Sequence, residues 1–82
     1  MKSKVRDLID AERRRQQEKW GGSHLWGHGD CSSTGVSDSI KLAVLLEEVG
    51  EAARAFLDRD VEAMRDELVQ VAAVAVAWLE AL

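Results

Sequence analysis

The stretch LLEEVGEAARAFLDRDVEAMRDELVQVAAVAVAWLEAL, from Leu45 to Leu82, decides the fold class. Apolar residues recur in it at helical spacing, and the short polar sequence DRD at Asp58–Asp60 divides it into two halves. This pattern predicts two helices joined by a tight connection. We expect the first of them over Val36–Asp58 and the second over Val61–Ala81.

The rest of the chain adds one more helix and a loop. Val5, Leu8 and Ile9 follow the i, i+3, i+4 pattern, which predicts a helix from Ser3, as its cap, to about Trp20. Residues 21–35 contain five glycines and four serine or threonine residues without a clear period, which is typical of an irregular loop. The chain thus reads as one all-α domain over residues 1–82. Ser37 or Asp38 is expected to cap the second helix, and Asp60 the third.

The last helix is apolar on nearly all sides from Leu68 to Leu79. Such a helix is buried on several sides, and two further helices of the same chain would cover it poorly. Small domains are often stabilised by association. We therefore expect a three-helix subunit that forms a multi-chain helical bundle, either a homodimer or a homotetramer built as a dimer of dimers.

Composition narrows the range of partners. The formal net charge of −4 argues against a nucleic acid, whose phosphate backbone attracts basic patches. The uncharged apolar-rich run Leu68–Leu79 is too short to span a bilayer, so no membrane partner is expected. The polar N-terminus holds no apolar signal core, and the single cysteine, Cys31, cannot form an intrachain disulfide. A cytoplasmic location, in a bacterium or a phage-infected host cell, follows as an expectation.

Five polar side chains interrupt the two long apolar helices. They are Glu47, Glu48, Glu51, Glu67 and Gln70. Residues three apart share a helix face, so each helix presents one polar pair from a surface that is otherwise apolar. Buried carboxylates that converge are unfavourable, and helical bundles offset this by binding divalent cations between inward glutamates. The alternative is a solvated stripe, or ion pairs with Lys41, Arg54 or the arginines of the first helix.

These residues form a two-part motif. "EEVGE" is followed by 15 residues and then by "ELVQ", and this arrangement resembles the MazG-like all-α nucleoside triphosphate pyrophosphohydrolases, whose pattern is EExxE, a spacer and ExxD. The N-terminal "ERRRQQEKWG", followed by a histidine, also resembles the short phage-type members. The resemblance implies an enzyme that uses Mg²⁺ or Mn²⁺ to convert an NTP or dNTP, with dGTP or GTP as a candidate, to the monophosphate and pyrophosphate.

The same resemblance implies roles for the motif residues. Glu48, Glu51 and Glu67 are the main metal ligands, and Glu47 is an outer ligand or binds a further ion. The family's final aspartate falls on Gln70, whose amide oxygen can coordinate a metal but carries no charge. Glu48 or Glu51 would take the proton of the water that attacks the α-phosphorus. The alternatives are a nucleotide-binding module with a weakened metal site, or a helical interaction module whose acids are paired.

Substrate contacts are expected at the end of the first helix and in the loop. Trp20 and Trp26 offer flat apolar surfaces for a nucleobase. His24 can hydrogen-bond the base or the sugar. Lys19 and Arg14 can contact phosphate oxygens.

The loop also contains His24, His28 and Cys31, which could hold zinc with Asp30 as the fourth ligand. Their spacing is not that of a standard zinc finger. A mobile loop that nucleotide binding orders is the interpretation we favour.

Overall fold

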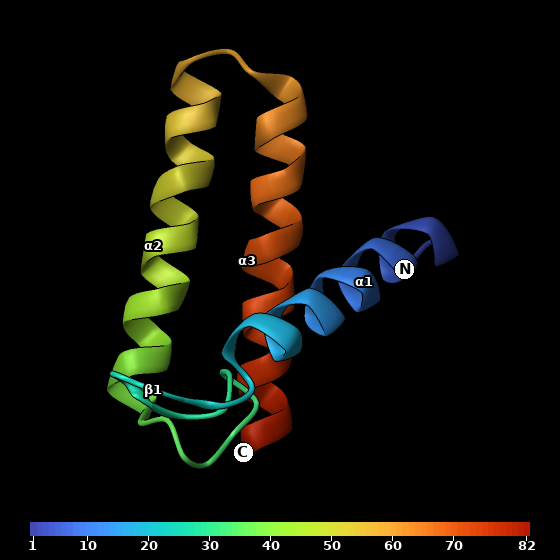
Figure 1. Cartoon of the computed structure of the whole chain (residues 1–82). Coiled ribbons are helices and arrows are strands. Elements are labelled where there is room, and N and C mark those ends of the chain that lie inside the picture. Colours follow the sequence, from blue (N-terminus) through green and yellow to red (C-terminus); the bar gives the residue numbers. More distant parts are fainter.

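The computed structural model describes residues 1–82 as three packed helices and a short hairpin. Helix α1 spans Ser3–Trp20, α2 spans Asp38–Leu57 and α3 spans Val61–Ala81, while the strands β1 (Ser23–His24) and β2 (Gly27–His28) lie between α1 and α2. Helices α2 and α3 run antiparallel, and α1 crosses α3 instead of running along it (Figure 1). The all-α class and the three helices are confirmed.

Small side chains line the contact between α2 and α3. Ala52 and Ala55 on α2, and Ala73, Val74 and Ala77 on α3, are the buried apolar residues of this pair. Short side chains at a helix contact let the two axes approach closely. The core is therefore thin, and it leaves little apolar volume to hold α1.

Two of the three expected helix caps are present. Ser37 Oγ and Asp60 Oδ1 accept hydrogen bonds from backbone N–H groups in the first turns of α2 and α3, at 3.3 and 3.0 Å, which pairs donors that the helix itself cannot satisfy. The expectation that Ser3 caps α1 was wrong. Ser3 is the first helical residue, and Lys2 stands at the cap position without a side-chain hydrogen bond.

The segment between α1 and α2 is more regular than its composition predicts. The strands pair antiparallel with His24 opposite Gly27, and Gly27 also bridges to Val36. Val36 is therefore part of the loop, and α2 begins two residues later than expected. Gly27 has φ of 138°, and a Cβ at this position would collide with the carbonyl oxygen of Gly35, so only glycine fits here.

A buried ion pair fixes this loop to α1. Arg13 Nη1 lies 2.7 Å from Asp30 Oδ2, and the two side chains are 8% and 6% exposed. Asp30 Oδ1 also accepts hydrogen bonds from the backbone N–H and the hydroxyl of Ser32. Burial acts to raise the pKa of Asp30, but the hydrogen bonds from Ser32 and Arg13 outweigh it and lower that pKa. A buried charge pair thus joins the loop to α1.

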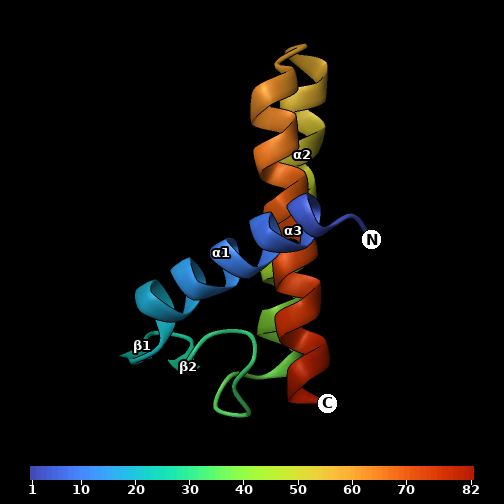
Figure 2. The same ribbon diagram turned by 90° about the vertical axis from the view of Figure 1, so that its right-hand side faces the viewer.

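Part of the apolar surface stays uncovered within one chain. Leu68 and Leu79 on α3 are 53% and 68% exposed, and Phe56 on α2 is 67% exposed. As expected from the sequence, the other two helices of the chain cover α3 incompletely. Figure 2 shows that α1 projects from one side of the α2–α3 pair and leaves the opposite side bare. None of the helices is long and apolar enough to cross a membrane.

Candidate functional site

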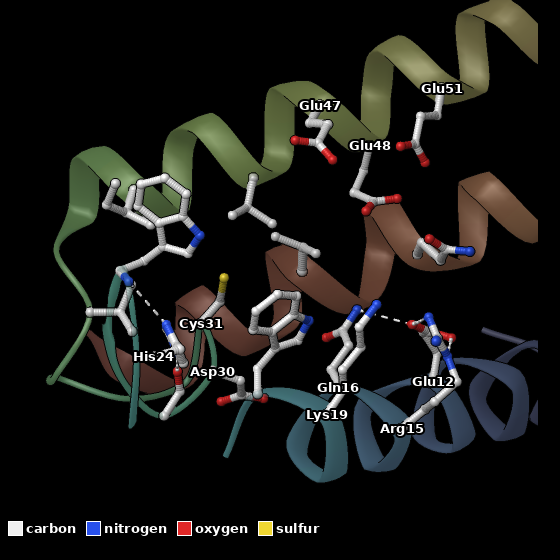
Figure 3. Close-up of a pocket in the computed structure, with 18 residues that line it drawn as sticks. Glu12, Arg15, Gln16, Lys19, His24, Asp30, Cys31, Glu47, Glu48 and Glu51 are labelled. Carbon is white, nitrogen blue, oxygen red and sulfur yellow. Dashed lines mark hydrogen bonds and ion pairs between the residues drawn. The ribbon is translucent and has the colours of Figure 1, made fainter. Parts of the chain in front are cut away.

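A cavity of about 570 Å³ lies between α1, the loop and the α2–α3 pair. This volume is in the range of small-molecule sites, about 300–1,000 Å³. Glutamates of α2 line one end, polar residues of α1 face them across the opening, and the loop closes the other end (Figure 3). The predicted motif residues except Glu67, and the predicted substrate residues except Arg14, therefore line one cavity.

Glu47, Glu48 and Glu51 form a cluster on α2. One carboxylate oxygen of each lies within 4.8 Å of the others, because Glu51 lies four positions after Glu47 and three after Glu48, and residues at these spacings share a helix face. None of the three takes part in an ion pair, and Arg54 pairs instead with Asp58 at 3.5 Å. The alternative in which basic side chains of the chain neutralise these acids is therefore not observed.

Two carboxylate oxygens at this cluster are buried without a donor. They are Oε2 of Glu48 and Oε2 of Glu67. Burial, followed by the charges of Glu51, Glu67 and Glu47, raises the pKa of Glu48 to about 7. Burial, followed by the adjacent Glu51 carboxylate, also raises the pKa of Glu67. Both groups lack the positive partner that would favour their ionised form.

This arrangement fits a divalent cation. Mg²⁺ binds oxygen at about 2.0–2.1 Å, so two of its ligands lie at most about 4.2 Å apart, and the glutamates need only small side-chain changes to reach that separation. A cation would also supply a partner for the two buried oxygens. Gln70 lines the cavity and can offer its amide oxygen, whereas Glu67 is adjacent to Glu51 but is not among the lining residues.

The wall that faces the glutamates comes from α1. Glu12, Arg15, Gln16 and Lys19 line it, and their spacing puts them on one helix face. Arg15 Nε and Nη2 donate to the two oxygens of Glu12 at 2.8 and 2.7 Å. Arg14, the arginine that we predicted, is exposed and outside the cavity, because adjacent residues point about 100° apart around a helix. Arg15 stands in the position that we expected for Arg14.

The opposite end of the cavity is aromatic. Trp20 and Trp26 line it and are 40% and 52% exposed, so neither is a core anchor. Trp20 contacts His24 edge-on, with ring centroids 5.4 Å apart. Nε2 of His24 lies 2.7 Å from the Gly29 carbonyl oxygen, and Nδ1 accepts from the Trp26 backbone N–H at 3.2 Å. Both ring nitrogens of His24 are therefore used within the loop. A ligand can contact the surface of the ring but finds no free nitrogen.

The zinc alternative is not supported. Nδ1 of His28 is hydrogen-bonded to Ser23 Oγ at 2.8 Å, and both nitrogens of His24 are engaged. Cys31 lines the cavity, and burial raises the pKa of its thiol. The group of acidic, histidine and cysteine side chains close enough to share an ion is the glutamate cluster on α2.

Comparison of the chain with known protein families, with characterised proteins and with solved structures gives no match. The MazG-like resemblance therefore stays a prediction that rests on the two-part motif.

Proposed function

We propose that this chain is a metal-dependent nucleotide pyrophosphohydrolase, which converts a nucleoside or deoxynucleoside triphosphate to the monophosphate and pyrophosphate. The observation that carries the proposal is the order of groups along one cavity. A glutamate cluster next to two buried, unpartnered carboxylate oxygens lies at one end, cationic side chains face it, and two tryptophans line the other end. A metal-bound triphosphate attached to a flat base presents matching groups in the same order.

The motif residues have distinct roles in this proposal. Glu48, Glu51 and Glu67 would hold Mg²⁺ or Mn²⁺, with Glu47 and Gln70 as outer ligands. When bound, such an ion neutralises phosphate charge and makes a water molecule more acidic. The glutamate cluster alone would repel the substrate, so nucleotide binding should depend on the metal.

The chain's own side chains complete the reaction. A water attacks the α-phosphorus, the bond from this phosphorus to the oxygen that bridges to the β-phosphate breaks, and pyrophosphate leaves. Glu51 is exposed in the cavity, whereas Oε2 of Glu48 is buried, so we assign the water's proton to Glu51. Lys19 contacts phosphate oxygens, and Trp20 and Trp26 hold the base between apolar faces.

The test is a panel of the common NTPs and dNTPs, incubated with Mg²⁺, with Mn²⁺ or with EDTA, with monophosphate, pyrophosphate and orthophosphate separated by chromatography. We expect metal-dependent release of monophosphate and pyrophosphate. Glu51→Gln should lower turnover by at least about a hundredfold and also reduce the metal-dependent rise in melting temperature, because it removes a metal ligand as well as the proton acceptor. Diphosphate and orthophosphate as products would show that another bond is cut and would refute the assignment.

A second candidate is a nucleotide-binding module without turnover. Gln70 favours it, because a neutral amide stands in the cavity wall where the family pattern has an aspartate. In that case the nucleotide panel would give no products, while nucleotide together with metal would still raise the melting temperature. Gln70→Asp would then be expected to create turnover.

We propose that a second copy of the chain covers the bare apolar surface. The exposed residues Leu42, Leu46, Val49, Ala53 and Phe56 follow one another on α2 at alternating steps of four and three. This spacing is typical of helices that pack against other helices. A homodimer or homotetramer, which the sequence also predicts, would bury them.

A further inference from the structure

We propose that Arg15, held in place by Glu12, binds the terminal phosphate of the substrate and makes the cavity selective for triphosphates over diphosphates. The inference rests on the proposed function, because it places the base at the tryptophan end and the phosphates at the glutamate end. It names a specificity-determining residue that lies outside the acidic motif.

The order of residues along α1 places Arg15 at the far end of the phosphate chain. Each residue toward the N-terminus lies about 1.5 Å farther along the helix axis, so Arg15 lies about 7.5 Å beyond Trp20 along α1. Lys19 comes first on this path. In Figure 3 the loop residue His24 lies at one end of the cavity, and Arg15 lies at the other end, beside Glu12 and across the cavity from the glutamates of α2. Phosphates that extend from a base at Trp20 therefore pass Lys19 first and reach Arg15 last.

The contact with Glu12 fixes the direction of the Arg15 side chain. Glu12 accepts from Nε and Nη2 of Arg15 and also from Nε2 of Gln16, at 3.3 Å. The Glu12 side chain is 11% exposed, whereas that of Arg15 is 55% exposed. The carboxylate is thus the anchored partner, and the guanidinium is the partner that extends into open space.

Arg15 keeps donors free for a ligand. A guanidinium has five N–H groups, and the Glu12 pairing uses two of them. The remaining donors match phosphate oxygens, which arginine binds through paired, charge-assisted hydrogen bonds. Arg15 and Lys19 are the two cationic residues of the cavity wall. After the adjacent Glu12, the charge of Glu48 across the cavity also contributes to raising the pKa of Arg15.

The test compares two neighbouring arginines. Binding of guanosine α,β-imidotriphosphate and of guanosine α,β-imidodiphosphate to the full chain is measured by calorimetry with Mn²⁺. We expect wild type to prefer the triphosphate by at least about tenfold. Arg15→Met should weaken triphosphate binding by about ten- to a hundredfold, the effect of losing a charged hydrogen bond, and leave diphosphate binding within about threefold. Arg14→Met removes the same charge outside the cavity and should change neither.

Two further variants separate positioning from charge. Glu12→Gln keeps the Arg15 charge but weakens the contact that orients its guanidinium. It should weaken triphosphate binding by several-fold without changing diphosphate binding. Arg15→Lys keeps the charge without the planar fork, and it should recover only part of the preference. Both variants should melt within a few degrees of wild type, because the side chain of Arg15 is 55% exposed and such a pair contributes little to stability.

The role of Arg15 and the proposed hydrolysis can fail independently of each other. The inference would be overturned if Arg15→Met and Arg14→Met lost the same affinity, or if Arg15→Met lost the same affinity for both compounds. It would also be overturned if wild type bound neither compound. Hydrolysis that proceeds in Arg15→Met with an unchanged preference for triphosphate would leave the proposed function standing and refute the role of Arg15. Triphosphate binding that depends on Arg15, without hydrolysis, would support the role of Arg15 and refute the proposed function.

Discussion

Replacing Glu48 by glutamine should stabilise the metal-free protein at pH 8. In the folded chain the pKa of Glu48 is about 7, against an ordinary value of 4.5. The folded state therefore binds more protons than the unfolded state between these two values, so the free energy of unfolding falls as the pH rises from 4.5 to 7. The difference corresponds to about 3.4 kcal/mol. Because solvent screens a partly exposed carboxylate, we expect about 1–2 kcal/mol.

The assay is urea unfolding followed by circular dichroism, at pH 5 and pH 8, with EDTA and at one protein concentration. Glu48→Gln should match wild type at pH 5, where Glu48 is protonated, and exceed it at pH 8. Glu18→Gln removes an exposed glutamate of α1 outside the cavity and should stay within about 0.5 kcal/mol of wild type at both pH values.

Bound metal should make wild type more stable than Glu48→Gln. At about a hundredfold excess over the dissociation constant, Mg²⁺ or Mn²⁺ would stabilise wild type by about 2.7 kcal/mol, and Glu48→Gln by less, because a ligand has been lost. A Glu48→Gln variant that is less stable than wild type at pH 8 without metal would refute the reasoning. Glu48 would then have a positive partner in solution, and the glutamate cluster would not be a site that awaits a cation.

Three further changes test the packing of the loop, the start of α3 and the proposed contact between copies. Asp30→Asn should destabilise the chain by up to about 3 kcal/mol, measured by urea unfolding, because it removes the 2.7 Å partner of buried Arg13 and leaves the longer contact with Glu80, at 3.6 Å; a loss below about 1 kcal/mol would mean that the pair does not hold the loop. Asp60→Ala should cost about 1 kcal/mol in the same experiment through the lost cap of α3, and no change would show that the cap is not formed. Leu46→Glu should shift the sedimentation coefficient toward that of a monomer, whereas Leu25→Glu, at an exposed loop position, should not; equal behaviour of the two would refute the proposed interface.

The sequence predicts those parts of the fold that depend on neighbours along the chain. The bounds of α1 and α3 agree with the expected Ser3–Trp20 and Val61–Ala81, because apolar period and helix-breaking residues are local signals. The caps at Ser37 and Asp60 follow for the same reason. The burial of the apolar residues of α3 cannot be predicted from local sequence, because it depends on how many helices surround α3.

The loop could not be predicted in this way. Its strands are two residues long, so they contain no measurable alternation. The ion pair that holds it joins residues 17 positions apart, and Arg13 stands in a run of three arginines that look equivalent in the sequence. Ile9 and Arg13 are the buried residues of α1 and lie four apart, which fixes the helix face that meets the rest of the protein. Arg15 lines the cavity and Arg14 does not, but the position of Arg13 does not predict this, because both neighbouring arginines point away from it around the helix.

The loss of folding stability caused by the buried Glu48 carboxylate indicates that the glutamate cluster has a ligand. A destabilisation of about 1–2 kcal/mol is a substantial part of the roughly 5–15 kcal/mol that holds a small domain together, and the core here consists largely of alanines. An apolar or amide side chain in place of Glu48 would relieve that cost, as Gln70 already does at the edge of the cavity. Acids in such a position are expected where a bound cation returns more free energy than their burial removes. Because the cationic face of α1 opens onto the same cavity, the cation would be shared with an anionic ligand, which is the arrangement that a metal-bound triphosphate requires.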